Sequence, residues 1–119
     1  MAAEDPTAYL PLSPAVFHVM VSLVDADRHG YAIIKDVDER TGGAERLGAG
    51  TLYAILKRLL DDGLIAEMRG ARIGFDDQRR RYYRLTPLGR RVAKAEVERL
   101  ERASAQARST RLFGKTRPA

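Results

Sequence analysis

One stretch of the sequence changes its hydrophobic period from that of a helix to that of strands, and this change constrains the fold most. Apolar residues recur at helical spacing over residues 51–62: Leu52, Ile55, Leu56 and Leu59. Gly63 comes next, and glycine commonly ends a helix in the left-handed conformation. The following segments, residues 64–69 and 80–85, fit short strands. The sequence therefore predicts a helix that leads directly into a β-hairpin.

Two helices are predicted from the residues that open them, Ser13-Pro14 and Thr86-Pro87. In each pair a hydroxyl can accept from the first free amides of the helix, and proline loses nothing at the first helical position. The first helix should end near residues 25–28. The second should be long and run to about residue 111.

A shorter helix is predicted over residues 31–40, where apolar residues again fall on one face. Thr41-Gly42-Gly43 follows, and glycine supplies the backbone conformation that ends the helix. Residues 45–47 are expected to form a one-rung strand. Gly48-Ala49-Gly50 then allows a sharp turn into the helix at 51–62.

The last helix has only one thin apolar seam among charged residues. Its members follow a 4-3-4-3 spacing: Ala93, Val97, Leu100, Ser104 and Ala107. A long charged helix with so narrow a seam is not stable alone, because it buries too little apolar surface. The seam therefore needs a partner, in the same chain or in another.

The order helix, helix, tight turn, helix, hairpin and helix is that of a winged helix-turn-helix, a mainly helical α+β fold. We expect four parts: a flexible N-terminal arm (1–11), the winged-helix DNA-binding domain (12–86), a C-terminal dimerisation helix (87–111) and a disordered tail (112–119). In the returning strand, Tyr82 and Tyr83 cannot both face one core. One is expected to pack and the other to be partly exposed.

Positive charge is concentrated around the hairpin. The whole chain has a net charge of +5, whereas residues 69–91 alone hold eight arginines against two aspartates, a net charge of +6. Five of these arginines are on or near the tip and are candidate DNA contacts: Arg69, Arg72, Arg79, Arg80 and Arg81. Guanidinium groups suit phosphates and narrow minor grooves. A solvated charge run is the plain alternative, but three consecutive arginines repel one another without an anion nearby.

The helix at 51–62 offers a second set of candidate DNA contacts on the face opposite its apolar residues. The set is Gly50, Thr51, Tyr53, Ala54, Lys57 and Arg58, with Tyr31 and Lys35 added from the preceding helix. Short and hydrogen-bonding side chains let a helix approach base edges, and cations one turn later can take phosphates or a guanine edge. An ordinary solvated helix face is the alternative, and the arginine-rich hairpin beside it favours DNA.

Four motifs in this order resemble those of the PadR family of bacterial transcriptional regulators. They are His29-Gly30-Tyr31, Gly50-Thr51-Leu52-Tyr53, Asp62-Gly63-Leu64-Ile65 and the run from Arg80 to Gly89. The resemblance implies a homodimeric repressor joined through its C-terminal helix, so the apolar seam of that helix is expected to be the dimerisation surface. It also implies that Tyr53 lies on the recognition helix and Arg80–Tyr83 on the returning wing strand. Ala49 departs from the family, in which many relatives have proline there.

Composition excludes several other functions. Without cysteine there are no thiolate metal sites, and His18 and His29 form no ligand cluster, so neither a metal nor a cofactor is expected. No catalytic constellation, membrane span or signal peptide is evident, which favours a non-enzymatic, cytoplasmic protein. The chain also lacks tryptophan, on which some drug-sensing relatives stack flat ligands, so no small-molecule effector site is predicted. A winged-helix module that binds protein is the rival function, but the arginine-rich wing argues against it.

Overall fold

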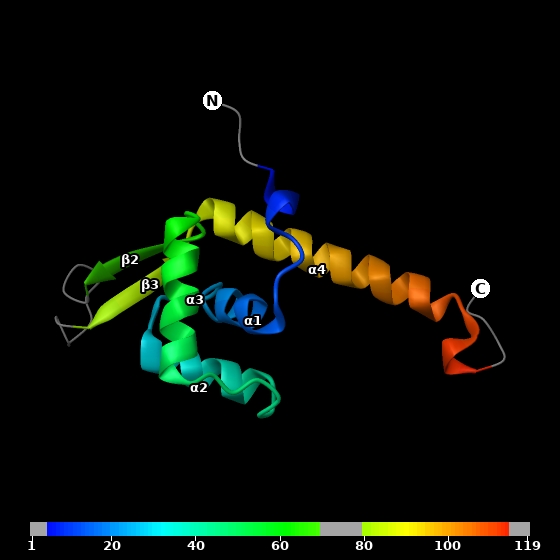
Figure 1. Ribbon diagram of the computed structural model, residues 1–119, viewed down its shortest axis with the longest axis horizontal. Helices are drawn as coiled ribbons and strands as arrows, with labels where there is room; N and C mark the ends of the chain where they lie inside the picture. The colour runs from blue at the N-terminus through cyan, green and yellow to red at the C-terminus, as the bar shows by residue number, and fades with distance from the viewer. Residues whose placement is uncertain (1–4, 70–79, 115–119) are drawn as a thin grey trace.

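The computed structural model describes residues 5–69 and 80–114. Its elements, in chain order, are η1 (Pro6–Tyr9), α1 (Pro14–Ser22), β1 (Arg28–His29), α2 (Gly30–Arg40), α3 (Ala49–Asp61), β2 (Ile65–Arg69), β3 (Arg81–Leu85), α4 (Pro87–Arg108) and η3 (Arg111–Phe113). The first three α-helices gather beside the β2–β3 hairpin, and α4 extends away from them (Figure 1). The predicted class, mainly helical α+β, is confirmed.

The predicted helix caps are present at the start of α1 and α4. Ser13 Oγ accepts from the amide of Val16 at 3.2 Å, and Thr86 Oγ1 accepts from the amide of Gly89 at 3.0 Å. The helix α1 ends at Ser22, three residues before the predicted end. The Ser22 carbonyl accepts from Arg28 Nε at 2.7 Å, so the chain has already turned toward β1.

The sheet has three antiparallel strands in the order β1-β3-β2, and β1 was not predicted. Arg28 pairs with Tyr83 and His29 with Tyr82. The short strand β1 therefore covers the edge of β3 that β2 does not. The one-rung strand expected at residues 45–47 is wrong, because that segment carries no strand. Leu47 is instead buried in the core and anchors the connection between α2 and α3.

Tyr82 and Tyr83 are both buried, which corrects the expectation that one would be partly exposed. They point to opposite faces of β3, and Tyr83 belongs to the main core. Tyr82 is covered on the other face because β3 is the central strand. It lies between Met68 of β2 and His29 of β1, whose ring contacts it edge to face at 5.4 Å.

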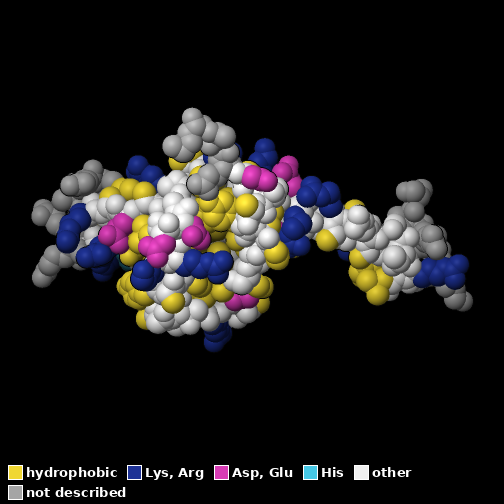
Figure 2. Space-filling view, turned by 45° about the horizontal axis from the view of Figure 1, so that its top comes forward, with side chains coloured by type: hydrophobic (Ala, Val, Ile, Leu, Met, Phe, Trp, Pro, Cys, Tyr) yellow, Lys and Arg dark blue, Asp and Glu magenta, His cyan; other side chains and the backbone are white. Residues whose placement is uncertain are grey.

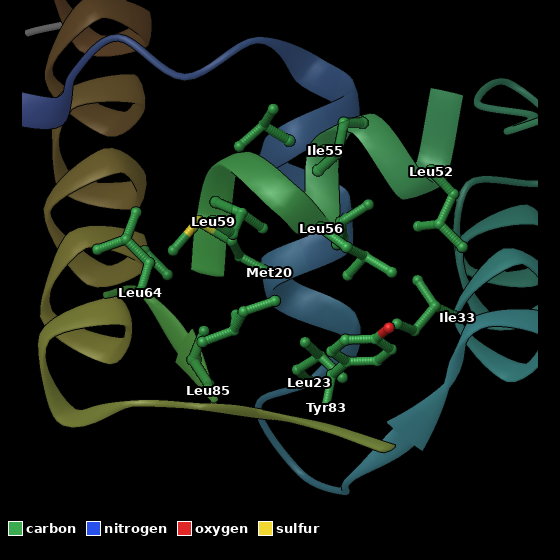
Figure 3. Close-up of a cluster of buried hydrophobic side chains, with 14 of the residues drawn as sticks. Met20, Leu23, Ile33, Leu52, Ile55, Leu56, Leu59, Leu64, Tyr83 and Leu85 are labelled. Atoms are coloured by element: carbon green, nitrogen blue, oxygen red, sulfur yellow. The ribbon is translucent and has the colours of Figure 1, made fainter. Parts of the chain in front are cut away.

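The core lies where α1, α2 and α3 meet the sheet. Figure 3 shows side chains from these elements converging on one another, including Met20 of α1, Ile33 of α2 and Leu56 of α3, with Tyr83 and Leu85 from β3. All four apolar positions predicted for the helix at 51–62 are buried. Burial of one face leaves the opposite face of α3 to solvent.

The N-terminal segment differs from the expected flexible arm over the part that is described. Residues 6–9 form η1, and Tyr9, Leu10 and Leu12 pack against the core. The amide of Leu12 donates to Glu96 Oε2 at 2.9 Å, and Arg99 pairs with the same carboxylate. Arg99 and this amide hold the pKa of the buried Glu96 below its usual value despite burial, so the carboxylate stays charged.

The predicted seam of α4 is divided between two environments. Ala93 is buried in the core of its own chain, whereas Val97, Leu100, Ser104 and Ala107 are exposed. Among the described residues no helix is both long and apolar enough to cross a membrane, α4 included. The tail expected to be disordered from residue 112 begins with η3 instead, where Arg108 lies over the Phe113 ring.

The end of α3 and the start of α4 meet at Leu64. The amides of Leu64 and Gly63 close α3 on Leu59 O and Leu60 O, and Gly63 has φ +74°, as its sequence position predicts. The Leu64 carbonyl then accepts from the amide of Thr86 at 3.1 Å. A Cβ at Gly89 would lie 2.0 Å from that carbonyl oxygen, so only glycine lets α4 approach this closely.

We therefore expect Gly89→Ala to lower the free energy of unfolding by at least about 2 kcal/mol, because backbone must move to admit the methyl group. Gly50→Ala is the matched control, a glycine in the first turn of α3 with nothing within 4 Å of a Cβ. It should raise stability by up to about 1 kcal/mol. Urea unfolding measures both variants, and equal effects would contradict the tight contact at Leu64.

Candidate nucleic-acid interface

The solvent face of α3 carries the side chains that the sequence analysis placed there. Thr51, Tyr53, Ala54, Lys57 and Arg58 are all exposed, with Tyr53 at 56%. Gly48 caps the helix without a side-chain hydrogen bond, so no side chain competes for the first amides of α3. Such amides are donors for an anion.

A hollow of about 550 Å³ lies beside this face, where α2, α3 and β3 come together. It is lined by His29, Gly30, Tyr31, Tyr53, Arg80, Arg81 and Tyr83. Four of these residues are predicted DNA contacts from three separate segments: Tyr31, Tyr53, Arg80 and Arg81. We call this hollow the wing hollow. The fold thus brings together the start of α2, the recognition face of α3 and the base of the hairpin.

Gly30 makes the close approach of α2 and α3 within the wing hollow. A Cβ at this position would be 3.1 Å from the hydroxyl of Tyr53 and 3.5 Å from Leu52. Because hydrogen replaces that methyl group, Tyr53 can lie across the first turn of α2. Tyr31, next in sequence, is 71% exposed at the rim.

His29 connects the wing hollow to the start of α2. Its Nδ1 accepts from the amide of Ala32 at 3.2 Å and so caps α2, and its Nε2 lies 2.7 Å from Arg80 Nη1. A neutral imidazole has one acceptor nitrogen, so Ala32 and Arg80 compete for it. When Nδ1 caps the helix, Nε2 carries a proton and no longer accepts from Arg80.

Tyr83 forms the buried wall of the wing hollow. Burial in the core, and then the charge of Glu67, raise its pKa above the usual value, so its hydroxyl stays neutral. His29 and Tyr83 were not predicted as part of this site. The His29-Gly30-Tyr31 motif was the sequence signal for His29. For Tyr83, the alternation with Leu85 along the strand indicated only a core position.

Several candidate DNA-contacting cations are paired with nearby carboxylates. Lys57 lies 3.1 Å from Asp61, Arg58 lies 3.9 Å from Asp62, and Arg81 lies 3.2 Å from Glu67. Exposed pairs of this kind contribute only about 0.2–1 kcal/mol, so a phosphate can replace the carboxylate at little cost. Figure 2 shows Lys and Arg side chains next to Asp and Glu at the hairpin end of the molecule, with other Lys and Arg side chains along the extended arm.

The remaining predicted residues are placed as follows. Gly50, Lys35 and Arg69 are exposed, on α3, α2 and the end of β2. Arg72 and Arg79 lie outside the described residues. Over the described ranges, no three His, Asp or Glu side chains are grouped as metal ligands.

Known proteins are similar to this chain in sequence and in fold. A family model described as "Transcriptional regulator PadR-like family" matches residues 19–95. A transcriptional regulator from Clostridium thermocellum is 26% identical, with a TM-score of 0.67, over 82% of this chain and 95% of that one. A PadR family regulator from Clostridium difficile is 28% identical, with a TM-score of 0.63, over 80% and 97%. Another from Eggerthella lenta is 29% identical, with a TM-score of 0.59, over 77% and 75%.

Two curated relatives are also similar, each 34% identical. One is an uncharacterized protein of Lysinibacillus sphaericus, matched over 57% of this chain, and the other an uncharacterized 37.1 kDa protein in a transposon of Streptomyces fradiae, matched over 72%. The matched segment spans 61% and 23% of the lengths of these relatives.

The cap formed by His29 can be tested by comparing two substitutions. We expect His29→Ala to lower the free energy of unfolding by about 1 kcal/mol more than His29→Asn, because asparagine also caps helices well. Both variants lose the ring contact with Tyr82, so their difference isolates the cap.

His18, within α1, supplies the matched control. There alanine should be at least as stable as asparagine, because helix propensity favours it. Denaturant unfolding of the four variants measures both differences. Equal stability of His29→Ala and His29→Asn would show that Nδ1 contributes no cap.

Proposed function

The chain belongs to the PadR-like family of transcriptional regulators, and from this premise we propose that it is a repressor that binds a palindromic operator as a homodimer. The family consists of DNA-binding regulators and not of enzymes. Such a repressor acts in the cytoplasm, where its operator is. In this proposal residues 12–86 bind DNA and residues 87–111 join the two subunits.

The convergence on the wing hollow is the observation that carries the proposal. Tyr31, Tyr53 and the arginines at 80 and 81 come from separate segments, yet all line one exposed hollow beside the free face of α3. Hydroxyls and guanidinium groups together are the donors that proteins use on the phosphates of DNA.

Each side of the interface has a distinct role in this proposal. α3 lies in the major groove, where Thr51 and Tyr53 bond phosphates or bases and Ala54 meets a thymine methyl group. Lys57 and Arg58 take phosphates or a guanine edge. The arginines of the hairpin hold the sugar-phosphate backbone or a narrow minor groove, without reading sequence.

The exposed part of the α4 seam supports the dimer. Val97, Leu100 and Ser104, with Phe17 of α1, line a shallow groove of about 540 Å³. Val97 and Leu100 are 41% and 43% exposed, which leaves apolar surface that a second α4 can cover. Two recognition helices joined in this way would read half-sites about 34 Å apart, one turn of DNA.

The role of the wing arginines is tested with the double variant Arg80→Ala/Arg81→Ala. We expect it to weaken binding to operator and random duplex by the same factor, and to lower the salt dependence by about 0.9 for each lost phosphate contact. Tyr53→Ala should instead weaken operator binding more than random-duplex binding, by about 1–3 kcal/mol where its hydroxyl reads a base edge. Equal losses on both DNAs would show that Tyr53 only positions the helix. The operator is first selected from a random duplex pool, and affinities are then measured by fluorescence anisotropy.

Arg91→Ala/Arg102→Ala is the control for charge, since both residues are exposed on α4 away from the wing hollow. It should leave affinity and salt dependence nearly unchanged. If both double variants behave alike, the wing does not contact DNA. A wild-type chain that binds no duplex at low salt would favour the protein-binding rival.

The dimer is tested with Leu100→Glu, which places a charge in the exposed seam. We expect wild type to sediment as a dimer at micromolar concentration and this variant as a monomer, because the charge would be buried without a partner. Gln106→Glu adds the same charge at an exposed position of α4 outside the groove and should stay dimeric. A monomeric wild type would contradict the proposed dimer.

A further inference from the structure

A second hollow adjoins the wing hollow on the far side of Tyr31. It measures about 450 Å³ and is lined by Tyr31, Ile34, Lys35, Asp38, Arg46 and Leu47. Tyr31 lines both hollows and stands between them. Ile34 and Leu47 form the apolar wall, and the charged groups are those of Lys35, Asp38 and Arg46. The connection between α2 and α3 therefore brings a cation next to the recognition surface.

Asp38 holds the Arg46 guanidinium by one edge. Arg46 Nε lies 3.4 Å from Asp38 Oδ1, and the Arg46 side chain is nevertheless 80% exposed. Its Nη2 rests against Gly43, where a Cβ would be 3.3 Å away. Leu47, directly after Arg46, is buried and anchors this part of the chain. The guanidinium thus lies beside a carboxylate on one edge while most of its side chain faces solvent.

The carboxylate gains little from Arg46 beyond charge. Asp38 Oδ1 is buried and, within the described part of the chain, makes no hydrogen bond. The ion pair nevertheless brings Arg46 near it. Guanidinium has five donors in a rigid fork that matches phosphate oxygens. An arginine oriented by a carboxylate behind it, with its outer donors exposed, is prepared for a phosphate in front.

We propose that Arg46, with Lys35 beside it, binds a phosphate of the DNA backbone on the side of α3 away from the wing. The inference rests on the proposed function and adds a site to it. A helix in the major groove is bordered by a phosphate backbone on each side, about 12 Å apart. In Figure 1 the hairpin leaves α3 on one side, and the α2–α3 connection, which contains residue 46, runs to the other.

Arg40 offers a matched control within the same segment. It also pairs with a carboxylate of α2, lying 2.8 Å from Asp36, and it is exposed. It lines neither hollow, because Asp36 and Arg40 fall on the face of α2 away from Asp38. Loss of either arginine removes one charge, so any difference between them reports position.

Arg46→Ala and Arg40→Ala are compared with wild type on the selected operator and on random duplex, over 50 to 200 mM salt. We expect Arg46→Ala to lower the salt slope of binding by about 0.9 on both DNAs. Its loss of affinity relative to wild type should therefore be about three to four times larger at 50 mM salt than at 200 mM. Ethylation interference should lose one phosphate in each half-site. Arg40→Ala should match wild type, and both variants should keep the wild-type melting temperature.

The failures of the two proposals are distinguishable. A wild type that binds no duplex overturns the proposed function. If wild type binds and the two arginine variants have the same slope and the same interference pattern, the Arg46 phosphate site is wrong while the function stands. A loss confined to the operator would also overturn it, because a phosphate contact carries no sequence information.

Discussion

The backbone contact at Leu64 joins the three elements on which the interface depends. Its amide closes α3, its carbonyl accepts from Thr86, and Thr86 Oγ1 donates to the neighbouring Gly63 carbonyl at 2.7 Å. The same Leu64 carbonyl lies where a side chain on Gly89 would have to be. The end of the recognition helix, the base of the hairpin and the first turn of α4 thus share one small set of hydrogen bonds, and none can turn without the others.

This junction connects the helix proposed to read DNA with the helix proposed to form the dimer. α4 leaves it in a direction set by the Thr86 cap and by burial of Val92 and Ala93, and the charged Glu96 ties the N-terminal segment to the same face. The exposed residues Val97 and Leu100 lie beyond that packed part. In a symmetric dimer, the junction at Leu64 and the contact between the two α4 helices would together set the separation of the two α3 helices. The proposed operator binding by a dimer therefore depends on α4 being rigid where it leaves the core.

Local signals explain what could be predicted of the fold. The caps at Ser13 and Thr86 and the glycine after α3 act through neighbours in sequence, and all are present as predicted. β1 carried no such signal, because two residues become a strand only by pairing with β3. Burial of Tyr82 likewise depends on strands on both sides. Ala93 is buried in the core of its own chain because Gly89 lets the start of α4 pack closely. Helical spacing alone does not indicate this close packing.

The candidate site divides in the same way. Spacing alone placed Tyr53 and Lys57 on the solvent face of α3, because burial of the opposite face decides it. The convergence of Tyr31 and Arg80 on one hollow needed the tertiary fold, and so did the carboxylate behind Arg46. Weak exposed ion pairs hold long cationic side chains near the surface without binding them tightly. If these cations bind phosphates as proposed, exchange of the carboxylates for phosphates would need little rearrangement of the protein, and the acidic residues would serve to orient the cations.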